Sequence, residues 1–375
     1  MKAKIFISGD IVNTQNTIPF ISNDLQKIIQ EQDFSVCNFE APIEGVGAKI
    51  IKAGPHLNQK SETIKLLETA GFNLLLLANN HIYDYGEEAL VTTMQKASEA
   101  NLHTIGAGLN KEDAYKPLIK EINGIKIGFI NACEAQFGVL DGTNPKQGSG
   151  YAWINHQLIN ELIISTKKNV DKLILCVHAG LEDYPVPLYE WKERYKNLCD
   201  IGVDCIVGSH PHTPQGYEIY KNKPIFYSLG NFYFDTASFE SLPDYSYSLI
   251  LEITKEEINF KTIFHHKENG IVRLTKNKEE SFDLDILNSQ ILDDKILDEV
   301  YLDAYEKITG NYFASVFNSL QFAGSFIQFI KHFIKIFFFS KKIRKRREVL
   351  LFHLIRNETY RWITQRAIAL KKFKK

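Results

Sequence analysis

Short apolar runs alternate with stretches of helical spacing over roughly the first 275 residues. Runs typical of buried or half-buried strands are found at residues 4–8, 34–37, 73–78, 124–131, 173–178, 205–207, 225–228, 245–254 and 258–265. Residues 61–70 and 86–100 have helical periodicity, and Gly71 stops the first of these helices. Repeated alternation of strand and helix predicts an α/β domain whose helices cover its sheets.

The character of the chain changes after this region. Residues 276–296 are acidic and lose the strand pattern, and from about residue 296 onward the spacing is helical. We therefore predict a first domain over residues 1–275 and a helical C-terminal extension over residues 285–375.

Polar residues of a restricted kind stand where the predicted strands end. They are Asp10, Asn38, Glu40, Asn79, Asn80, His81, His178, His210, His212 and Asn231. In α/β sheets the carboxyl ends of the strands are where ligands bind, so these side chains are expected to converge in one crevice. His210 and His212 are two residues apart, and in an extended stretch they would point the same way.

The residue types agree with a metal centre. Carboxylate, imidazole and amide-oxygen ligands without thiolate suit Mn, Fe, Zn or Co. A bridging carboxylate can hold two such cations ~3.5–4 Å apart, where they would clamp an oxyanion and lower the pKa of a bound water toward ~7.

These residues lie in longer motifs that resemble a known family. The motifs are Gly9-Asp10, Asn38-Phe-Glu-Ala-Pro42, Ala78-Asn-Asn-His-Ile-Tyr-Asp-Tyr-Gly86, Gly106-Ala-Gly108, His178-Ala-Gly-Leu-Glu182, Gly208-Ser-His-Pro-His212 and Tyr227-Ser-Leu-Gly-Asn-Phe-Tyr-Phe-Asp235. They are similar to those of CapA-type capsule-synthesis (poly-γ-glutamate) proteins, a branch of the metallophosphatase or calcineurin-like phosphoesterase superfamily. The resemblance covers roughly residues 1–260. It implies a four-layer αββα sandwich, with two divalent metals at the strand ends.

The resemblance also implies a role for each motif residue. Metal ligands would be Asp10, Glu40 as the bridging carboxylate, Asn80, His178, His210 and His212. His81 would lie near the leaving group. One position departs from the superfamily's Asp-x-His motif, because Val12 stands where the histidine is usual. The first metal position therefore lacks a usual imidazole ligand.

Four further residues are candidates for the site, and three of them carry open alternatives. Asp84 either orients His81, as carboxylates near metal-site histidines do, or caps the helix that follows. Glu182 is either an acid/base or substrate contact, or a loop charge. Asn38 and Asn231 are predicted to contact substrate, although Asn231 can equally serve its glycine turn.

Composition adds an asymmetry of charge. Lys and Arg (44) nearly balance Asp and Glu (45), and 44% of the residues are apolar, which excludes global disorder and a generally basic nucleic-acid binder. Residues 331–375 nevertheless carry a net charge of +13, and the rest carry −14. The five cysteines form no CxxC pair and sit in apolar runs, which predicts buried thiols in a reducing compartment.

The basic tail has three interpretations. Residues 316–339 place Phe and Ile on one helical face, and a Lys/Arg cluster follows at 341–347. This pattern fits an anionic membrane surface contacted through residues 316–347. The alternatives are a helical cap docked on the acidic body and, least favoured, a nucleic-acid contact. Without a leader at the N-terminus, the expected location is the cytoplasm, with a peripheral site at the inner membrane face.

Two functions follow. The first is a metal-dependent, phosphoesterase-like hydrolase or transferase in capsule or surface-polymer synthesis, with His81, Asp84 and Glu182 as catalytic residues. Its substrate would be a phosphoester or an anionic surface polymer. The second is a non-catalytic, membrane-associated accessory protein that binds an anionic capsule polymer. A nucleotide-binding module is excluded, since neither GxGxxG after a strand nor GxxxxGK[ST] occurs.

Overall fold

The structure of the 375-residue chain is a computed structural model. It describes residues 1–15, 17–142, 147–235, 242–308 and 349–373. The chain divides into two compact units. The first comprises Met1–Ile50 and His56–Asp293, and the second Ile51–Pro55 and Asp294–Lys375.

The first unit contains two large sheets. The first sheet runs in the order β16 (Ile271–Leu274), β15 (Ile258–Glu268), β14 (Tyr245–Ile253), β1 (Ala3–Val12), β2 (Phe34–Phe39), β3 (Leu74–Leu76) and β4 (His103–Ile105), with β13 (Asn231–Phe234) beside β1. Strands β1 to β4 and β13 are parallel, and β14 to β16 form an antiparallel wing. The carboxyl ends of β1, β2 and β3 therefore meet at one edge.

The second sheet has a parallel centre. Its order is β11 (Tyr217–Tyr220), β12 (Lys223–Phe226), β10 (Cys205–Ser209), β9 (Lys172–His178), β7 (Ile125–Cys133) and β6 (Leu118–Ile122). Strands β7, β9, β10 and β12 are parallel, and β6 and β11 are antiparallel edges. A short pair, β5 (Ala107–Gly108) with β8 (Gly150–Tyr151), stands apart from both sheets.

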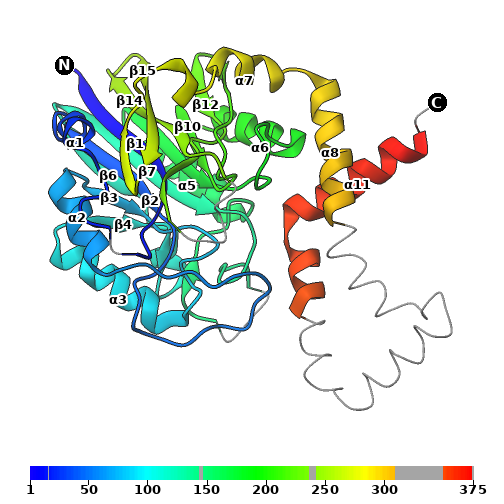
Figure 1. The fold of residues 1–375 in the computed structure, drawn as a ribbon, viewed down its shortest axis with the longest axis horizontal. Coiled ribbons are helices and arrows are strands. Elements are labelled where there is room, and N and C mark those ends of the chain that lie inside the picture. The colour runs from blue at the N-terminus through cyan, green and yellow to red at the C-terminus, as the bar shows by residue number, and fades with distance from the viewer. Residues whose placement is uncertain (16, 143–146, 236–241, 309–348, 374–375) are drawn as a thin grey trace. The chain divides into compact units, whose positions relative to one another are not determined.

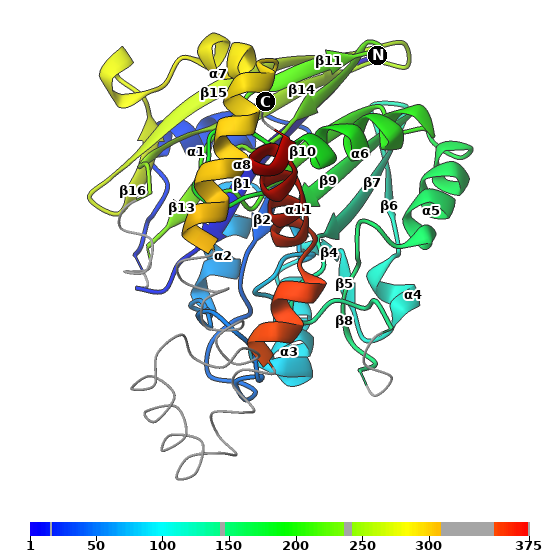
Figure 2. The same cartoon turned by 90° about the vertical axis from the view of Figure 1, so that its right-hand side faces the viewer.

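The two sheets pack face to face, and helices cover their outer faces (Figure 1). One buried apolar cluster joins Ile5 and Leu249 of the first sheet to Phe129 and Ile174 of the second. On the other face of the first sheet, Phe6 packs in a cluster with apolar residues of α1 (Asn23–Gln30), α2 (Glu62–Ala70) and α3 (Gly86–Glu99). Helices α5 (Gln157–Lys167) and α6 (Tyr189–Asp200) contact the second sheet (Figure 2). The predicted four-layer αββα sandwich is confirmed.

Strand β1 runs further than the sequence pattern predicts, and Asp10 lies inside it rather than after it. The pairing of β1 with β2 shifts register between Ser8 and Asp10. Along its other side β1 pairs first with β14 and then with β13, so that Asp10 lies opposite Asn231. Gly9 makes this exchange possible, because a Cβ there would stand 1.9 Å from the Gly230 carbonyl oxygen.

The remaining described elements are helices, three of them short. In the first unit they are α4 (Lys111–Ala114), η2 (Lys278–Glu280) and α7 (Leu284–Gln290). In the second unit, α8 (Asp294–Ile308) packs against α11 (Glu358–Phe373), and residues 349–356 are also helical. Arg366 of α11 lies 3.1 Å from the Asp298 carboxylate of α8.

The amphipathic stretch 316–339 and the basic cluster 341–347 lie outside the described residues. Within the described ranges, every helix is too short or too polar to cross a bilayer. All five cysteines are buried, as predicted.

Candidate metal centre

The strand ends of both sheets deliver polar side chains to one buried place. Asp10 comes from β1, Glu40 follows β2, and Asn80 follows β3. From the second sheet, His178 ends β9, and His210 follows β10. Each of these side chains, that of His212 included, is 5% exposed or less, and ligand atoms of the six candidates lie close to one another.

Four donors form a close set that we name the His178 group: Glu40, Asn80, His178 and His210. His178 Nε2 lies 2.9 Å from Asn80 Oδ1, 3.0 Å from His210 Nδ1 and 3.4 Å from Glu40 Oε1. Two imidazoles, a carboxylate and an amide oxygen thus face one point. The donor types and their number suit a divalent transition metal.

A second set, the Asp10 group, consists of Asp10, Glu40 and His212. His212 Nδ1 lies 3.6 Å from Asp10 Oδ2, and its Nε2 lies 3.8 Å from Glu40 Oε1. Ligand atoms of these three residues fall within 4.8 Å of one another. Glu40 belongs to both groups and so stands where a bridging carboxylate is needed.

Apolar side chains surround the position at which a second imidazole is usual. Val12 is fully buried and clusters with Ala41, Leu57 and Phe234. The Asp10 group, as the described residues define it, therefore contains a single imidazole.

The electrostatics of the site favour a bound cation. Burial, together with the nearby Glu40 carboxylate, raises the pKa of Asp10 to about 7. Burial lowers the pKa of His178 to about 4 and that of His212 to about 3, which leaves both imidazoles neutral and able to ligate. A divalent cation would offset the repulsion between the two carboxylates, so the residues present fit such an ion.

The two asparagines predicted to contact substrate lie against metal-ligand candidates. Asn38 donates to Asp10 Oδ1 at 2.6 Å and lies 3.0 Å from His178 Nδ1. Asn231 Oδ1 lies 2.9 Å from His212 Nδ1. Both contacts orient side chains that are ligand candidates. A contact of either asparagine with substrate stays a prediction.

Asp84 is placed to orient His81. Its Oδ2 lies 2.7 Å from His81 Nδ1 and also accepts the Leu57 backbone N–H at 2.7 Å. Helix α3 begins after Tyr85, without a side-chain capping bond. Of the two interpretations of Asp84, the contact with His81 is the one present in the structure.

Two further carboxylates approach the other face of His210. Glu182, whose side chain is 40% exposed, has its Oε1 3.6 Å from His210 Nε2. Glu134, which is fully buried, has its Oε1 3.7 Å from the same nitrogen. The sequence pattern did not single out Glu134. The missed signal is the end of strand β7, the neighbour of β9 in the parallel sheet.

The backbone at His210 and His212 is not extended, so that prediction is wrong. Their φ angles are +98° and +59°, in the left-handed region. The His210 N–H contacts Asp10 Oδ2 at 3.2 Å, which helps to hold this turn. Both rings still reach the site, each in one of the two groups named above, and together with Glu182 they form a third set whose ligand atoms lie within 4.8 Å of one another.

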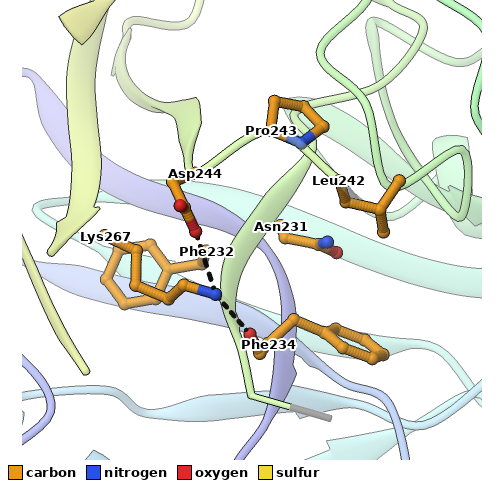
Figure 3. A pocket seen from close by; sticks show the side chains of 7 residues that line it. All are labelled: Asn231, Phe232, Phe234, Leu242, Pro243, Asp244 and Lys267. Atoms are coloured by element: carbon orange, nitrogen blue, oxygen red, sulfur yellow. Dashed lines mark hydrogen bonds and ion pairs between the residues drawn. The ribbon is translucent and has the colours of Figure 1, made fainter. Parts of the chain in front are cut away.

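A small pocket lies beside Asn231 (Figure 3). Lys267 enters it, pairs with Asp244 Oδ1 at 3.0 Å and donates to the Phe234 carbonyl at 2.7 Å. Phe232, Leu242 and Pro243 complete the lining. Asn231 thus connects this pocket to the Asp10 group through His212.

Comparisons with known proteins show the family of the chain. The family model described as bacterial capsule synthesis protein PGA_cap matches residues 5–236. The capsule biosynthesis protein CapA of Bacillus anthracis is 32% identical over 233 residues, which are 60% of this chain and 56% of that protein. The PGA biosynthesis protein CapA of Bacillus subtilis is 31% identical over 229 residues, 60% of this chain and 59% of that protein. The matches thus span under two thirds of either relative.

A solved structure, that of the calcineurin-like phosphoesterase YfkN from Bacillus subtilis, aligns with a TM-score of 0.44 and 16% sequence identity. The alignment covers 80% of this chain and 98% of that one.

Proposed function

The chain belongs to the bacterial capsule synthesis protein family PGA_cap, and from that premise we propose that it is a metal-dependent hydrolase or transferase in the synthesis of a capsule polymer. The observation that carries this proposal is the His178 group, in which His178 Nε2 lies within 3.4 Å of three other ligand atoms. Its substrate would be a phosphoester or another linkage of an anionic surface polymer.

In this proposal one set of residues binds the cations and another transfers a proton. The His178 group and the Asp10 group would hold two divalent cations, Mn, Fe or Zn, with Glu40 between them. Bound cations of this kind polarise a substrate oxygen and lower the pKa of water. Asp84 fixes His81 through Nδ1, so a protonated His81 would give its other ring proton to the leaving group. Glu182, partly exposed beside His210, would contact substrate or assist proton transfer.

Metal analysis combined with a hydrolysis assay tests this function. We expect the purified chain to hold Mn, Fe or Zn and to hydrolyse an aryl phosphate or phosphodiester. His210→Ala should lose metal and activity together. His81→Ala should keep the metal and lose about 10²–10⁴-fold in rate, the usual share of a general acid. A protein without metal, or equal activity in all three forms, would refute the enzyme.

The apolar surroundings of Val12 favour a second candidate function. With one imidazole in the Asp10 group, the site could bind an anionic polymer without cutting it, as a non-catalytic accessory of the capsule machinery. The discriminating experiment is genetic complementation. If His81→Ala restores capsule in cells lacking the protein as fully as the unaltered chain does, the accessory function is favoured.

We further propose that residues 316–347 bring the protein to the cytoplasmic face of an anionic membrane. This proposal rests on the sequence pattern of an aromatic helical face followed by the basic cluster 341–347. Co-sedimentation with vesicles containing an anionic phospholipid should fall when salt is raised and when the basic residues of 341–347 are replaced by Gln. Equal sedimentation of the two forms at low salt would contradict it.

A further inference from the structure

We propose that Glu134 and Gln136 form a positioning pair that holds Asn80 and His210 in the geometry a cation requires. This inference rests on the proposed function, because it concerns the affinity of the His178 group for its cation. The family resemblance gave neither residue a role. Both follow strand β7, which ends at Cys133.

The fold fixes the backbone of this pair next to the site. Strand β7 lies parallel to β9, with Cys133 opposite His178, and the Glu134 N–H donates to the His178 carbonyl at 3.1 Å. The buried Tyr151 hydroxyl accepts the Gln136 N–H at 2.9 Å and lies 3.2 Å from the Glu134 carbonyl oxygen. The two side chains therefore leave a rigid strand end beside a ligand of the metal centre.

Glu134 addresses the ring nitrogen of His210 that faces away from the His178 group. His210 Nδ1 faces His178, whereas Nε2 lies 3.7 Å from Glu134 Oε1. If Nδ1 gives its lone pair to a cation, the ring proton must sit on Nε2, next to this carboxylate. At 3.7 Å the carboxylate acts through its charge, which favours a proton on Nε2 and so leaves Nδ1 free to ligate, while Gln136 Nε2 lies 3.4 Å from the same ring nitrogen.

Gln136 performs the corresponding task for Asn80. Gln136 Oε1 accepts the Asn80 Nδ2–H at 3.4 Å, while Asn80 Oδ1 faces His178 Nε2 at 2.9 Å. The amide of Asn80 is thereby turned so that its oxygen, the atom able to bind a cation, faces the His178 group. Gln136 Nε2 also donates to Glu134 Oε1 at 2.8 Å, which links the two supports into one chain.

Because Glu134 is buried, its carboxylate interacts with His210 more strongly than the partly exposed carboxylate of Glu182 does. Glu134 is fully buried, and its Oε2 accepts the Gly180 N–H at 3.4 Å. Glu182 is 40% exposed and is therefore screened by water. Burying a charged carboxylate costs folding free energy unless an opposite charge lies nearby. A cation bound to the His178 group would therefore stabilise the charged form of Glu134.

Calorimetric titration of the metal-free full chain with Mn²⁺ tests the pair. Glu134→Gln keeps the shape of the side chain and should lower Mn²⁺ affinity by about 10–100-fold, the usual effect of losing such a partner. Gln136→Leu should lower it by about 10-fold. Glu121→Gln, an exposed carboxylate on the β6–β7 hairpin, is the matched control and should leave affinity unchanged.

Thermal unfolding separates positioning from damage to the fold. In chelator, Glu134→Gln should melt at or above the midpoint of the unaltered chain, because a buried charge is gone. With saturating Mn²⁺, its midpoint should rise less than that of the unaltered chain. Affinity within twofold of the unaltered chain, or a lower midpoint already in chelator, would overturn the positioning role. If the unaltered chain binds no Mn²⁺, or His210→Ala binds equally well, the proposed function itself fails.

Discussion

The His178 group and the Asp10 group share Glu40 but are unequally built. In the former, three donors lie 2.9–3.4 Å from His178 Nε2, and two of the group's four donors are imidazoles. In the latter, the imidazole of His212 stands 3.6 Å and 3.8 Å from its two carboxylates, and Val12 fills the neighbouring space with methyl groups. The difference leads us to expect that the site would bind one cation firmly and a second more weakly.

The largest effect should come from deleting one imidazole of each group. His210→Ala removes a donor of the His178 group and should lower the tighter Mn²⁺ affinity by more than about 100-fold, beyond what loss of a supporting partner costs. His212→Ala, a matched change two residues away, should reduce the weaker binding and alter the tighter one less than about 10-fold. Calorimetric titration of both variants measures this. An equal loss of Mn²⁺ affinity in the two variants would contradict the difference between the His178 group and the Asp10 group.

Low pH should reduce the stability of the protein through His265, which contacts the Asp10 group by way of Ser246, Asn231 and His212. His265 is fully buried between Ser246 and Ser248, beside the Phe232 ring, and burial lowers its pKa to about 3. Below pH ~6.5 the unfolded chain takes up a proton at this position and the folded chain does not. Stability contributed by neutral His265 is thus complete above pH ~6.5 and is lost as the pH falls toward 3.

The size of this acid effect can be measured with a variant. Between pH 6.5 and 5 the unaltered chain should lose about 2 kcal/mol more of its unfolding free energy than His265→Gln does, at ~1.4 kcal/mol per pH unit. Denaturant titrations at several pH values, with chelator present, give the two slopes. Identical slopes would show that His265 does not contribute.

A smaller effect should follow from removing the Ser246 hydroxyl from this series of contacts. The Ser246 hydroxyl donates to the Asn231 carbonyl and lies 3.0 Å from His265 Nδ1, and Asn231 in turn contacts His212. Ser246→Ala should cost about 1 kcal/mol of stability, the net value of a buried hydrogen bond. It should also weaken the second Mn²⁺ a few-fold and leave the first unchanged. Ser248→Ala is the control, since Ser248 contacts His265 without reaching Asn231.

The smallest effect is expected at Glu182. Its carboxylate is 3.6 Å from His210 Nε2 but is 40% exposed, so water screens the interaction. Glu182→Gln should change the tighter Mn²⁺ affinity by less than about threefold. A loss as large as that expected for Glu134→Gln would show that exposure does not distinguish the two carboxylates.

The fold and most of the site could be predicted because they depend on periodicity. Apolar runs located the strands, and parallel strands bring their carboxyl ends to one edge, so Asp10, Glu40, His178 and His210 were found without coordinates. The PGA_cap match confirms the family resemblance that these motifs carry.

The sequence pattern did not identify Glu134 as a site residue, because the predicted strand ends at the polar Asn131. Asn131 is instead buried within β7, where its Oδ1 accepts the Ala78 N–H at 2.7 Å and its Nδ2 donates to the Cys176 carbonyl at 3.2 Å. These bonds satisfy the amide, so the strand continues to Cys133 and Glu134 becomes a strand-end residue. Side-chain bonds between segments distant in sequence leave no mark on local hydrophobic spacing.

The left-handed backbone of His210 and His212 has an evolutionary consequence. Glycine adopts such angles freely, and either substitution would relieve strain of ~1 kcal/mol while deleting an imidazole. The same substitution would also empty the buried space that the ring fills, which costs more than the strain it relieves. A laboratory lineage kept under heat, with no demand for capsule, should therefore keep a side chain of similar volume at both positions even where the imidazole itself is lost.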